Sequence, residues 1–230
     1  MEDWAAVFAA AGAQPILYPT LVAAPPACWD KVDAALARLD DYDWLVFTSQ
    51  TAVAFVLGRS SNNRFPADLR TRIAAVGAKT ARAIEGGGGR VVLVPSDKRQ
   101  EGLAQAFSDL PAGTRVLLPI AAGGRTLLAE RLRARGCTVD VVTVYETQPN
   151  TTLPPPPAFD VATFASPSAL RAFLAGPGRT ALAKKTVAVI GPTTAEEAVT
   201  HGLVPVVAES PSVLDLIRAI ADSRPAKGDP

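Results

Sequence analysis

The stretch Asp43–Val53 reads DWLVFTSQTAV, and a close copy of it, Phe159–Leu170, reads FDVATFASPSAL. Each copy runs from an aspartate through a short apolar segment to a serine, Ser49 or Ser166, with helix-favouring residues beyond it. An apolar run that leads through a polar residue into a helix is typical of one strand–helix step in a parallel sheet. The chain therefore contains the same strand–helix step twice.

The repeat continues downstream of each serine. Ala75–Ala81 (AVGAKTA) matches Val189–Ala195 (VIGPTTA), and the spacing stays equal as far as Ser96 and Ser210. A repeat of this length indicates a duplicated domain rather than a solenoid unit. Because small ligands commonly bind where two domains meet, we expect a ligand site in a cleft between the copies.

Composition narrows the class of protein. The 230 residues are 48% hydrophobic and 20% charged, which is ordinary for a globular protein. The 23 basic and 22 acidic residues leave no net field for nucleic acid or an anionic membrane, and no apolar run approaches the ~20 residues of a membrane span. The first residues lack the basic segment of a secretory signal. We therefore expect a cytoplasmic monomer with a small-molecule partner, and no nucleic-acid or membrane partner.

Cysteine and histidine are too scarce for several kinds of site. Cys28 and Cys137 cannot form a disulfide framework or a zinc cluster, and we expect both to be buried, reduced thiols. The single histidine, His201, precedes Gly202 at a predicted helix C-terminus, which favours a structural role. We expect no metal and no cofactor, and any catalysis must use hydroxyls, backbone amides and a few charged groups.

Short β-branched runs alternate with helical stretches along the whole chain, which predicts βαβ units and parallel sheets. Leucines at helical spacing before Gly136 indicate an amphipathic helix that is closed by glycine. The predicted strands are Ile16–Tyr18, Trp44–Phe47, Ile73–Val76, Val91–Val94, Arg115–Leu118, Thr138–Val142, Val161–Phe164, Val187–Ile190 and Val204–Val207.

A third copy sets the domain organisation. Ala5–Leu17 (AAVFAAAGAQPIL) matches Ala129–Val141 (AERLRARGCTVDV), and in both a helix ends in glycine and leads into a strand. Proline-rich segments near residues 23–26 and 151–157 mark boundaries. We predict an inserted α/β domain over residues 28–144. The other α/β domain is discontinuous, combines residues 1–23 with 150–230, and is joined to the first by a two-segment hinge.

Hydroxyl residues and glycines follow the predicted strands in both domains, at the carboxyl ends where open α/β sheets bind ligands. Free helix N-terminal amides and these hydroxyls bind anions without much net charge, so carboxylates are the favoured ligand class. The alternative is that the hydroxyls only cap helices. A phosphate loop is not indicated, because Gly86–Gly89 precedes a strand rather than a helix. The candidate ligand-binding residues are Thr48, Ser49, Gly77, Thr80, Ser166, Pro167, Ser168, Gly191, Thr193 and Thr194.

These residues resemble the uroporphyrinogen-III synthase family over almost the whole chain. Each motif is short, but their order and spacing together are specific. Members have two flavodoxin-like domains with a two-stranded connection and a discontinuous first domain, so the resemblance implies the same α/β fold here. The resemblance is carried by Asp43–Ser49, Val76–Ala81, Leu127–Tyr145, Asp160–Ser168, Ile190–Ala195 and Glu209–Ser212.

The resemblance also implies a reaction. The family, a class of cyclising lyases, converts the linear tetrapyrrole hydroxymethylbilane into uroporphyrinogen III, inverts ring D through a spiro intermediate, and needs no metal or organic cofactor. Tyr145 matches the tyrosine that is the usual candidate for protonating the departing hydroxyl; the alternative is a tyrosine packed at the hinge with its hydroxyl bonded to the backbone. Thr193 and Thr194 would contact substrate, and Arg125 would hold a carboxylate unless it is a solvated surface arginine.

One departure from the family pattern concerns the first domain. Aligning Gly12 with Gly136 puts the counterpart of the strand at 115–118 before residue 1, so we expect this domain to lack its first strand. Either the natural start lies upstream or the strand has been lost. An alternative function is a non-catalytic two-domain module that binds a tetrapyrrole or another polycarboxylate. A clamshell solute-binding protein shares the double hinge but should carry an export signal.

Overall fold

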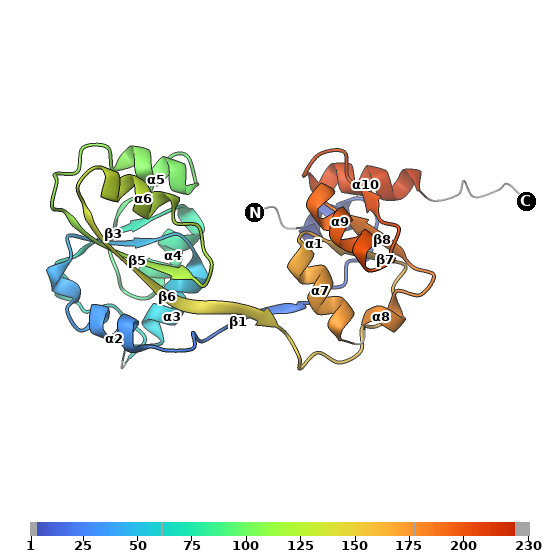
Figure 1. Cartoon of the computed structure of the whole chain (residues 1–230), viewed down its shortest axis with the longest axis horizontal. Helices are drawn as coiled ribbons and strands as arrows, with labels where there is room; N and C mark the ends of the chain where they lie inside the picture. Colours follow the sequence, from blue (N-terminus) through green and yellow to red (C-terminus); the bar gives the residue numbers. More distant parts are fainter. Residues whose placement is uncertain (1–3, 61, 177, 224–230) are drawn as a thin grey trace, which may run out of the picture. The chain divides into compact units, whose positions relative to one another are not determined.

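The structure is a computed structural model that describes residues 4–60, 62–176 and 178–223. The chain divides into two compact units (Figure 1): unit 1 comprises Met1–Val22 and Gln148–Pro230, and unit 2 comprises Ala23–Thr147. The chain passes between the units twice, through β1 (Leu21–Ala24) and β6 (Thr138–Pro149), and these two strands are hydrogen-bonded neighbours.

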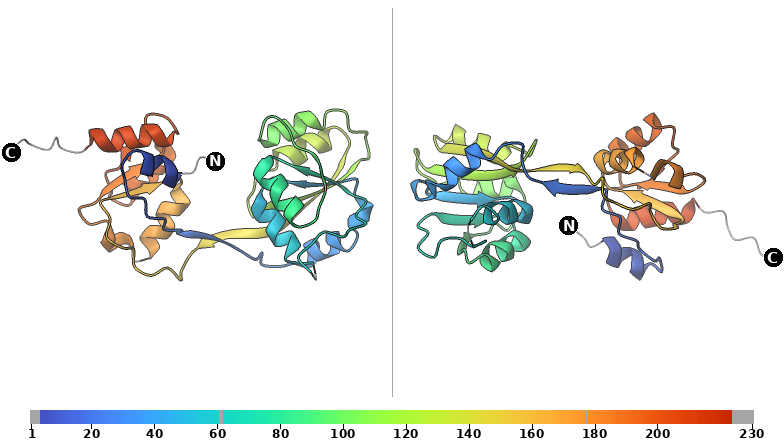
Figure 2. Two further views of the ribbon diagram at one scale, coloured as in Figure 1. Left: turned by 180° about the vertical axis from the view of Figure 1, so that it is seen from behind. Right: turned by 90° about the horizontal axis from the view of Figure 1, so that it is seen from below.

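Unit 2 is a sheet covered by helices on both faces (Figures 1 and 2). Besides β1 and β6, its strands are β2 (Trp44–Phe47), β3 (Arg72–Ala75), β4 (Val91–Leu93) and β5 (Arg115–Ala121). Its helices are α2 (Asp30–Leu36), the 3₁₀ turn η1 (Leu39–Asp41), α3 (Gln50–Leu57), α4 (Ala78–Gly86), α5 (Gln100–Ala106) and α6 (Leu127–Ala134).

The strand order in unit 2 is β1-β6-β5-β2-β3-β4. Strand β2 pairs in parallel with β3, where Trp44 lies opposite Arg72, and with β5, where Trp44 lies opposite Val116. The chain moves outward from β2 through β3 to β4, then returns to the other side of β2 for β5 and β6. This reversal between β2 and β5 is a topological switch point, where such sheets leave a crevice at the carboxyl ends of their strands.

The apolar residues of β2 divide between two cores. All four residues of β2 are buried, as is usual for a parallel strand covered on both faces. Because strand side chains alternate, Leu45 and Phe47 pack with α2, α3 and α4, whereas Trp44 and Val46 pack with α5 and α6. Trp44 meets Phe107, the C-cap residue of α5, edge-on at a centroid distance of 4.9 Å. The central strand is thereby fixed against both helix layers.

Unit 1 has a parallel three-stranded sheet in the order β7-β8-β9. Phe164 packs in one core with α7, α9 and Leu182, while Leu216 and Ile220 of α10 form the other with Trp4 of α1. Figure 2 shows α1 beside α10. The elements are α1 (Trp4–Ala10), β7 (Val161–Phe164), α7 (Pro167–Ala175), α8 (Gly178–Ala181), β8 (Thr186–Val189), α9 (Pro192–Thr200), β9 (Val206–Val207) and α10 (Val213–Asp222).

The predicted fold class is therefore confirmed: two similar α/β units with parallel sheets, the first of them discontinuous. The repeat at the helix ends also holds in detail. Gly12 and Gly136 both adopt left-handed φ values, +82° and +84°, which a side chain would oppose. Most predicted strands occur with ends shifted by one or two residues, while β5 and β6 run further than predicted.

The predicted strand Ile16–Tyr18 is wrong, because residues 13–20 have no regular structure. The equivalent strand in unit 2, β6, pairs with β5, but within the described part of unit 1 no strand lies in the place of β5. A single extended segment is not stable without a partner for its backbone groups. Hydrogen bonds with a later segment hold these residues instead: the Tyr18 hydroxyl donates to the Pro154 carbonyl at 2.7 Å, and the Asn150 amide donates to the Thr20 carbonyl at 2.8 Å. Leu17 is 79% exposed.

The expectation of two buried thiols is half wrong. Cys137 is buried, and burial raises the pKa of its thiol, but Cys28 is exposed because it lies in the loop before α2. His201 follows α9 at its C-cap, and its Nε2 lies 3.0 Å from the Glu197 carboxylate, consistent with the predicted structural role. None of the helices in the described part of the chain is long and apolar enough to cross a bilayer.

Candidate functional site

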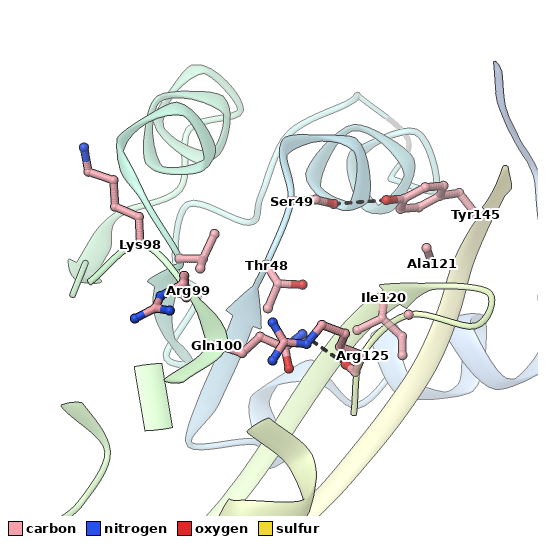
Figure 3. Close-up of a pocket in the computed structure, with 11 residues that line it drawn as sticks. Thr48, Ser49, Lys98, Arg99, Gln100, Ile120, Ala121, Arg125 and Tyr145 are labelled. Carbon is pink, nitrogen blue, oxygen red and sulfur yellow. Dashed lines mark hydrogen bonds between the residues drawn. The ribbon is translucent and has the colours of Figure 1, made fainter. Parts of the chain in front are cut away.

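A cavity of about 370 Å³ opens at the switch point of unit 2. The residues around it come from the carboxyl ends of β2, β3 and β5, from the middle of β6, from the loops that follow β4 and β5, and from the first residue of α5 (Figure 3). These strands are parallel, so their ends and the helices that follow meet at one edge of the sheet. The lining residues are Thr48, Ser49, Val76, Lys98, Arg99, Gln100, Ile120, Ala121, Gly124, Arg125 and Tyr145.

Ser49 caps the helix that follows β2. Its backbone is extended, with φ −153° and ψ 149°, and its Oγ accepts a hydrogen bond from the Ala52 amide at 3.0 Å. Ser49 is therefore the N-cap of α3. A capping serine uses Oγ as an acceptor and keeps its own proton to donate, so the cap and a ligand contact are compatible.

A β-bulge directs Tyr145 toward Ser49. Ile120 lies opposite Thr143, but Ala121 lies opposite Tyr145, so Val144 is the extra residue in β6. In a regular strand the side chains of Val144 and Tyr145 would point to opposite faces, and the bulge removes that alternation. Both side chains consequently pack into the core on the α3 side.

The Tyr145 ring is held by packing, and its hydroxyl faces the cavity. The ring stacks on Phe55 of α3 with centroids 5.6 Å apart and planes 19° apart. The phenol oxygen lies 3.5 Å from Ser49 Oγ (Figure 3). Its partner is thus a side-chain hydroxyl rather than the backbone group that the packing alternative requires. This phenol and this serine are the hydroxyl pair that could exchange a proton with a ligand.

A basic rim lies across the cavity from Tyr145, as Figure 3 shows. Arg125 pairs with Glu101 at 2.5 Å, and Arg99 pairs with Asp97 at 2.8 Å. Hydrogen bonds from these arginines lower the pKa of each carboxyl, so both remain ionised at neutral pH. The rim therefore combines charged pairs with the cation of Lys98, which also lines the cavity.

Gln100 fixes the position of the Arg125 loop. Its Nε2 donates to the Arg125 carbonyl at 3.0 Å, and its Oε1 accepts from the Leu128 amide at 3.2 Å in the first turn of α6. Sequence reasoning missed Lys98, Arg99 and Gln100. The signal available was their position around the start of α5, after the repeated spacing that ends at Ser96.

The predicted glycines and threonines differ in their exposure. Gly77 and Gly191 are the N-caps of α4 and α9 and have nearly identical extended backbones, with φ −174° and −178°, but Gly77 is buried and Gly191 is half-buried. Thr193 is exposed in the first turn of α9. Thr80 and Thr194 are only 5% and 3% exposed, so their side chains face the interior and leave little surface for a ligand.

The predicted residues after β7 form an equivalent cap in unit 1. Ser166 Oγ accepts from the Ala169 amide at 3.2 Å and lies 3.5 Å from Ser168 Oγ. Pro167 occupies the first turn of α7, where its missing amide proton costs no hydrogen bond. Both units thus present capped helix N-termini and hydroxyls at the carboxyl ends of their strands. Across the described residues, no group of three or more His, Cys, Asp or Glu side chains is arranged to hold a metal ion.

Comparison with known proteins relates the chain to one family. Residues 2–218 match the family model "Uroporphyrinogen-III synthase HemD". The uroporphyrinogen-III synthase of Synechococcus elongatus is 36% identical over 149 residues, which are 64% of this chain and 56% of that protein, so the match spans about half of the relative's length. The chloroplastic uroporphyrinogen-III synthase of Oryza sativa is 31% identical over 86% of this chain and 71% of its own.

A solved structure supports the same relationship at the level of the fold. The uroporphyrinogen-III synthetase of Helicobacter pylori superposes with a TM-score of 0.58 over 92% of this chain and 96% of that chain, at 20% sequence identity. The family model covers nearly the whole sequence, and the two-unit parallel α/β architecture agrees with it. The chain belongs to the uroporphyrinogen-III synthase family.

Proposed function

We propose that this protein is a uroporphyrinogen-III synthase, a cyclising lyase that converts hydroxymethylbilane into uroporphyrinogen III with inversion of ring D. The observation that carries the proposal is the Tyr145 phenol, 3.5 Å from Ser49 Oγ in a cavity with a basic rim, in a chain that belongs to this family. The protein would work in the cytoplasm as a monomer and without a metal or organic cofactor.

The proposed first step is loss of the substrate hydroxyl. A proton from Tyr145 reaches the hydroxymethyl oxygen as the carbon–oxygen bond breaks, so water leaves and an azafulvenium cation forms. The substituted α-carbon of ring D then attacks this cation and forms the spiro intermediate. Cleavage of the bond that joins ring D to its old neighbour, closure at the other α-carbon and loss of a proton complete the inverted ring. Overall the substrate loses one water.

The protein contributes positioning more than chemical activation, because the cation is intrinsically reactive. Direct closure without inversion competes with spiro formation, so the shape of the site decides which carbon attacks. Acetate and propionate groups would bind at helix N-termini and hydroxyls, including Thr48, Ser49 and Gly77, and at Arg125. Ser166, Ser168 and Thr193 would supply the contacts from unit 1.

A second candidate function is binding of a tetrapyrrole or another polycarboxylate without turnover. This function is favoured by the smaller sheet of unit 1, which has three strands over the described residues. Among these residues its strand β7, the counterpart of β2, has a neighbour only on the β8 side, whereas β2 has a neighbour on both sides. The residues that bind the ligand would be the same as in the synthase, but the binding module would form no uroporphyrinogen III.

A coupled assay separates the two functions. Hydroxymethylbilane is generated in situ, the products are oxidised to porphyrins, and isomers III and I are separated by chromatography. Isomer III above the uncatalysed background supports the synthase. Isomer I alone, from a protein that binds an oxidised porphyrin polycarboxylate, supports the binding module and contradicts the synthase.

A further inference from the structure

A second cavity adjoins the candidate site at the same edge of unit 2. It measures about 470 Å³ and is lined by Gln50 of α3 and by Lys79, Arg82 and Ala83 of α4. The two cavities share neighbours in the chain, because Gln50 directly follows Ser49 of the first cavity. They therefore flank the N-terminus of α4, where backbone amides already favour an anion.

Lys98 lies beside the N-terminus that the two cavities flank. A Cβ added to Gly77, the N-cap of α4, would lie 3.6 Å from both Cβ and Cγ of Lys98. The lysine stem thus packs beside the start of α4, and Lys98 is also one of the residues that line the first cavity. A side chain at position 77 would stand between Lys98 and the amides of α4.

The cations of this edge are not neutralised by the protein. Arg99 and Arg125 have carboxylate partners, but over the described residues Lys79, Arg82 and Lys98 form no ion pair. All three are exposed. Clustered cations repel one another unless an anion binds between them, so their gathering at one edge favours an anionic ligand.

The internal duplication offers a comparison of the two edges within one chain. Lys79 and Arg82 are the second and fifth residues of α4, and the same positions of α9 in unit 1 hold Thr193 and Glu196. The N-cap of α5 is Arg99, whereas the N-cap of α10 is Ser212. Two copies of one fold have thus diverged in charge at the carboxyl edge of their sheets.

We propose that the carboxyl edge of unit 2 binds the carboxylates of a tetrapyrrole polycarboxylate in both cavities, with Lys79, Arg82 and Gln50 forming a second carboxylate subsite. Unit 1 contributes hydroxyls and amides instead of cations. This inference rests on the proposed function for the identity of the ligand. Ammonium and guanidinium groups bind carboxylates through short charge-assisted hydrogen bonds, and salt weakens such contacts when they are exposed.

The test compares two pairs of substitutions in the full chain. K79Q/R82Q removes two charges at the proposed subsite, and R70Q/R90Q removes two charges near the amino ends of β3 and β4, at the opposite edge of the same sheet. All four residues are exposed, so neither pair should disturb folding, and thermal melting checks this. The probe is an oxidised porphyrin polycarboxylate, titrated by fluorescence at low and high salt, and isomer III formation is followed in parallel.

We expect K79Q/R82Q to raise the Kd of the porphyrin about tenfold at low salt and to reduce the salt dependence of Kd, whereas R70Q/R90Q leaves both unchanged. K79R/R82K, which keeps both positive charges, should stay within about twofold of the natural protein, because exposed contacts of this kind act mainly through charge. Equal effects from the two glutamine pairs, or no effect from either, overturn the subsite. Isomer III formation tests the synthase separately: a natural protein that makes isomer III but whose K79Q/R82Q variant binds normally refutes only the subsite.

Discussion

Replacement of Tyr145 by phenylalanine tests the proposed proton donor. The substitution keeps the ring, so the stacking on Phe55 and the packing beside Val144 are retained. It removes one hydroxyl whose contact with Ser49 Oγ is long, 3.5 Å, and Ser49 keeps its shorter bond from the Ala52 amide. The free energy of unfolding should therefore fall by less than about 1 kcal/mol.

The effect on turnover should be far larger than the effect on stability. General acid catalysis contributes about 10²–10⁴-fold, so kcat should fall by that factor, or about 3–5 kcal/mol in activation free energy. KM should change little, because the phenol acts on the departing hydroxyl. Single-turnover formation of isomer III from hydroxymethylbilane, with urea unfolding of the same samples, measures both quantities.

Tyr42→Phe is the matched control. The Tyr42 hydroxyl donates to the Asp140 carboxylate at 2.6 Å, away from the cavity, and Tyr42 is 3% exposed. Its loss should cost about 1–2 kcal/mol of stability and leave kcat unchanged, the reverse of the Tyr145→Phe pattern. Full activity in Tyr145→Phe would refute the acid role, and equal losses of activity in both variants would attribute the effect to structure.

Two further predictions concern unit 1 and pH. Gly191→Ala should raise KM about tenfold, because the added Cβ would cover the amides of α9. The melting temperature should fall by no more than a few degrees, because that Cβ would meet no atom within 4 Å. An unchanged KM would show that this end of α9 does not bind substrate. A hydrogen bond from Arg125 lowers the pKa of Glu101 from 4.5, so this carboxyl stabilises the fold above about pH 4.5 and loses that effect as the pH falls through its lower folded pKa. The melting temperatures of Glu101→Gln and the natural protein should therefore converge below that pH, and a gap that does not change with pH would contradict the assignment.

Several features of the fold could be predicted from the sequence, because they depend on residues close together in the chain. Ser49 and Ser166 cap helices after β2 and β7, as the repeated strand–serine–helix pattern indicated. The left-handed glycines Gly12 and Gly136 close the helices that the third repeat predicted. Local backbone preference, capping and periodicity decide such features, so a short window is sufficient to recognise them.

Other features depend on partners distant in the sequence. The segment at Ile16–Tyr18 has the composition of a strand, but over the described residues no neighbouring strand pairs with it, and it stays irregular. The bulge at Val144 depends on the register between β5 and β6, and no local sequence pattern predicts it. Without that bulge the Tyr145 side chain would lie on the other face of the sheet.

Amino-acid order alone was sufficient to determine the duplication, the α/β class, the discontinuous first domain and the candidate residues at the strand ends, because each repeats a local pattern. Tertiary structure decided which candidates meet. It placed Ser49 and Tyr145 in one cavity, turned Thr80 and Thr194 inward, and brought Lys98 from the loop after β4 beside the N-terminus of α4. The physical reason is that strand pairing and helix packing join segments far apart in sequence, and only those contacts set the direction in which a side chain points.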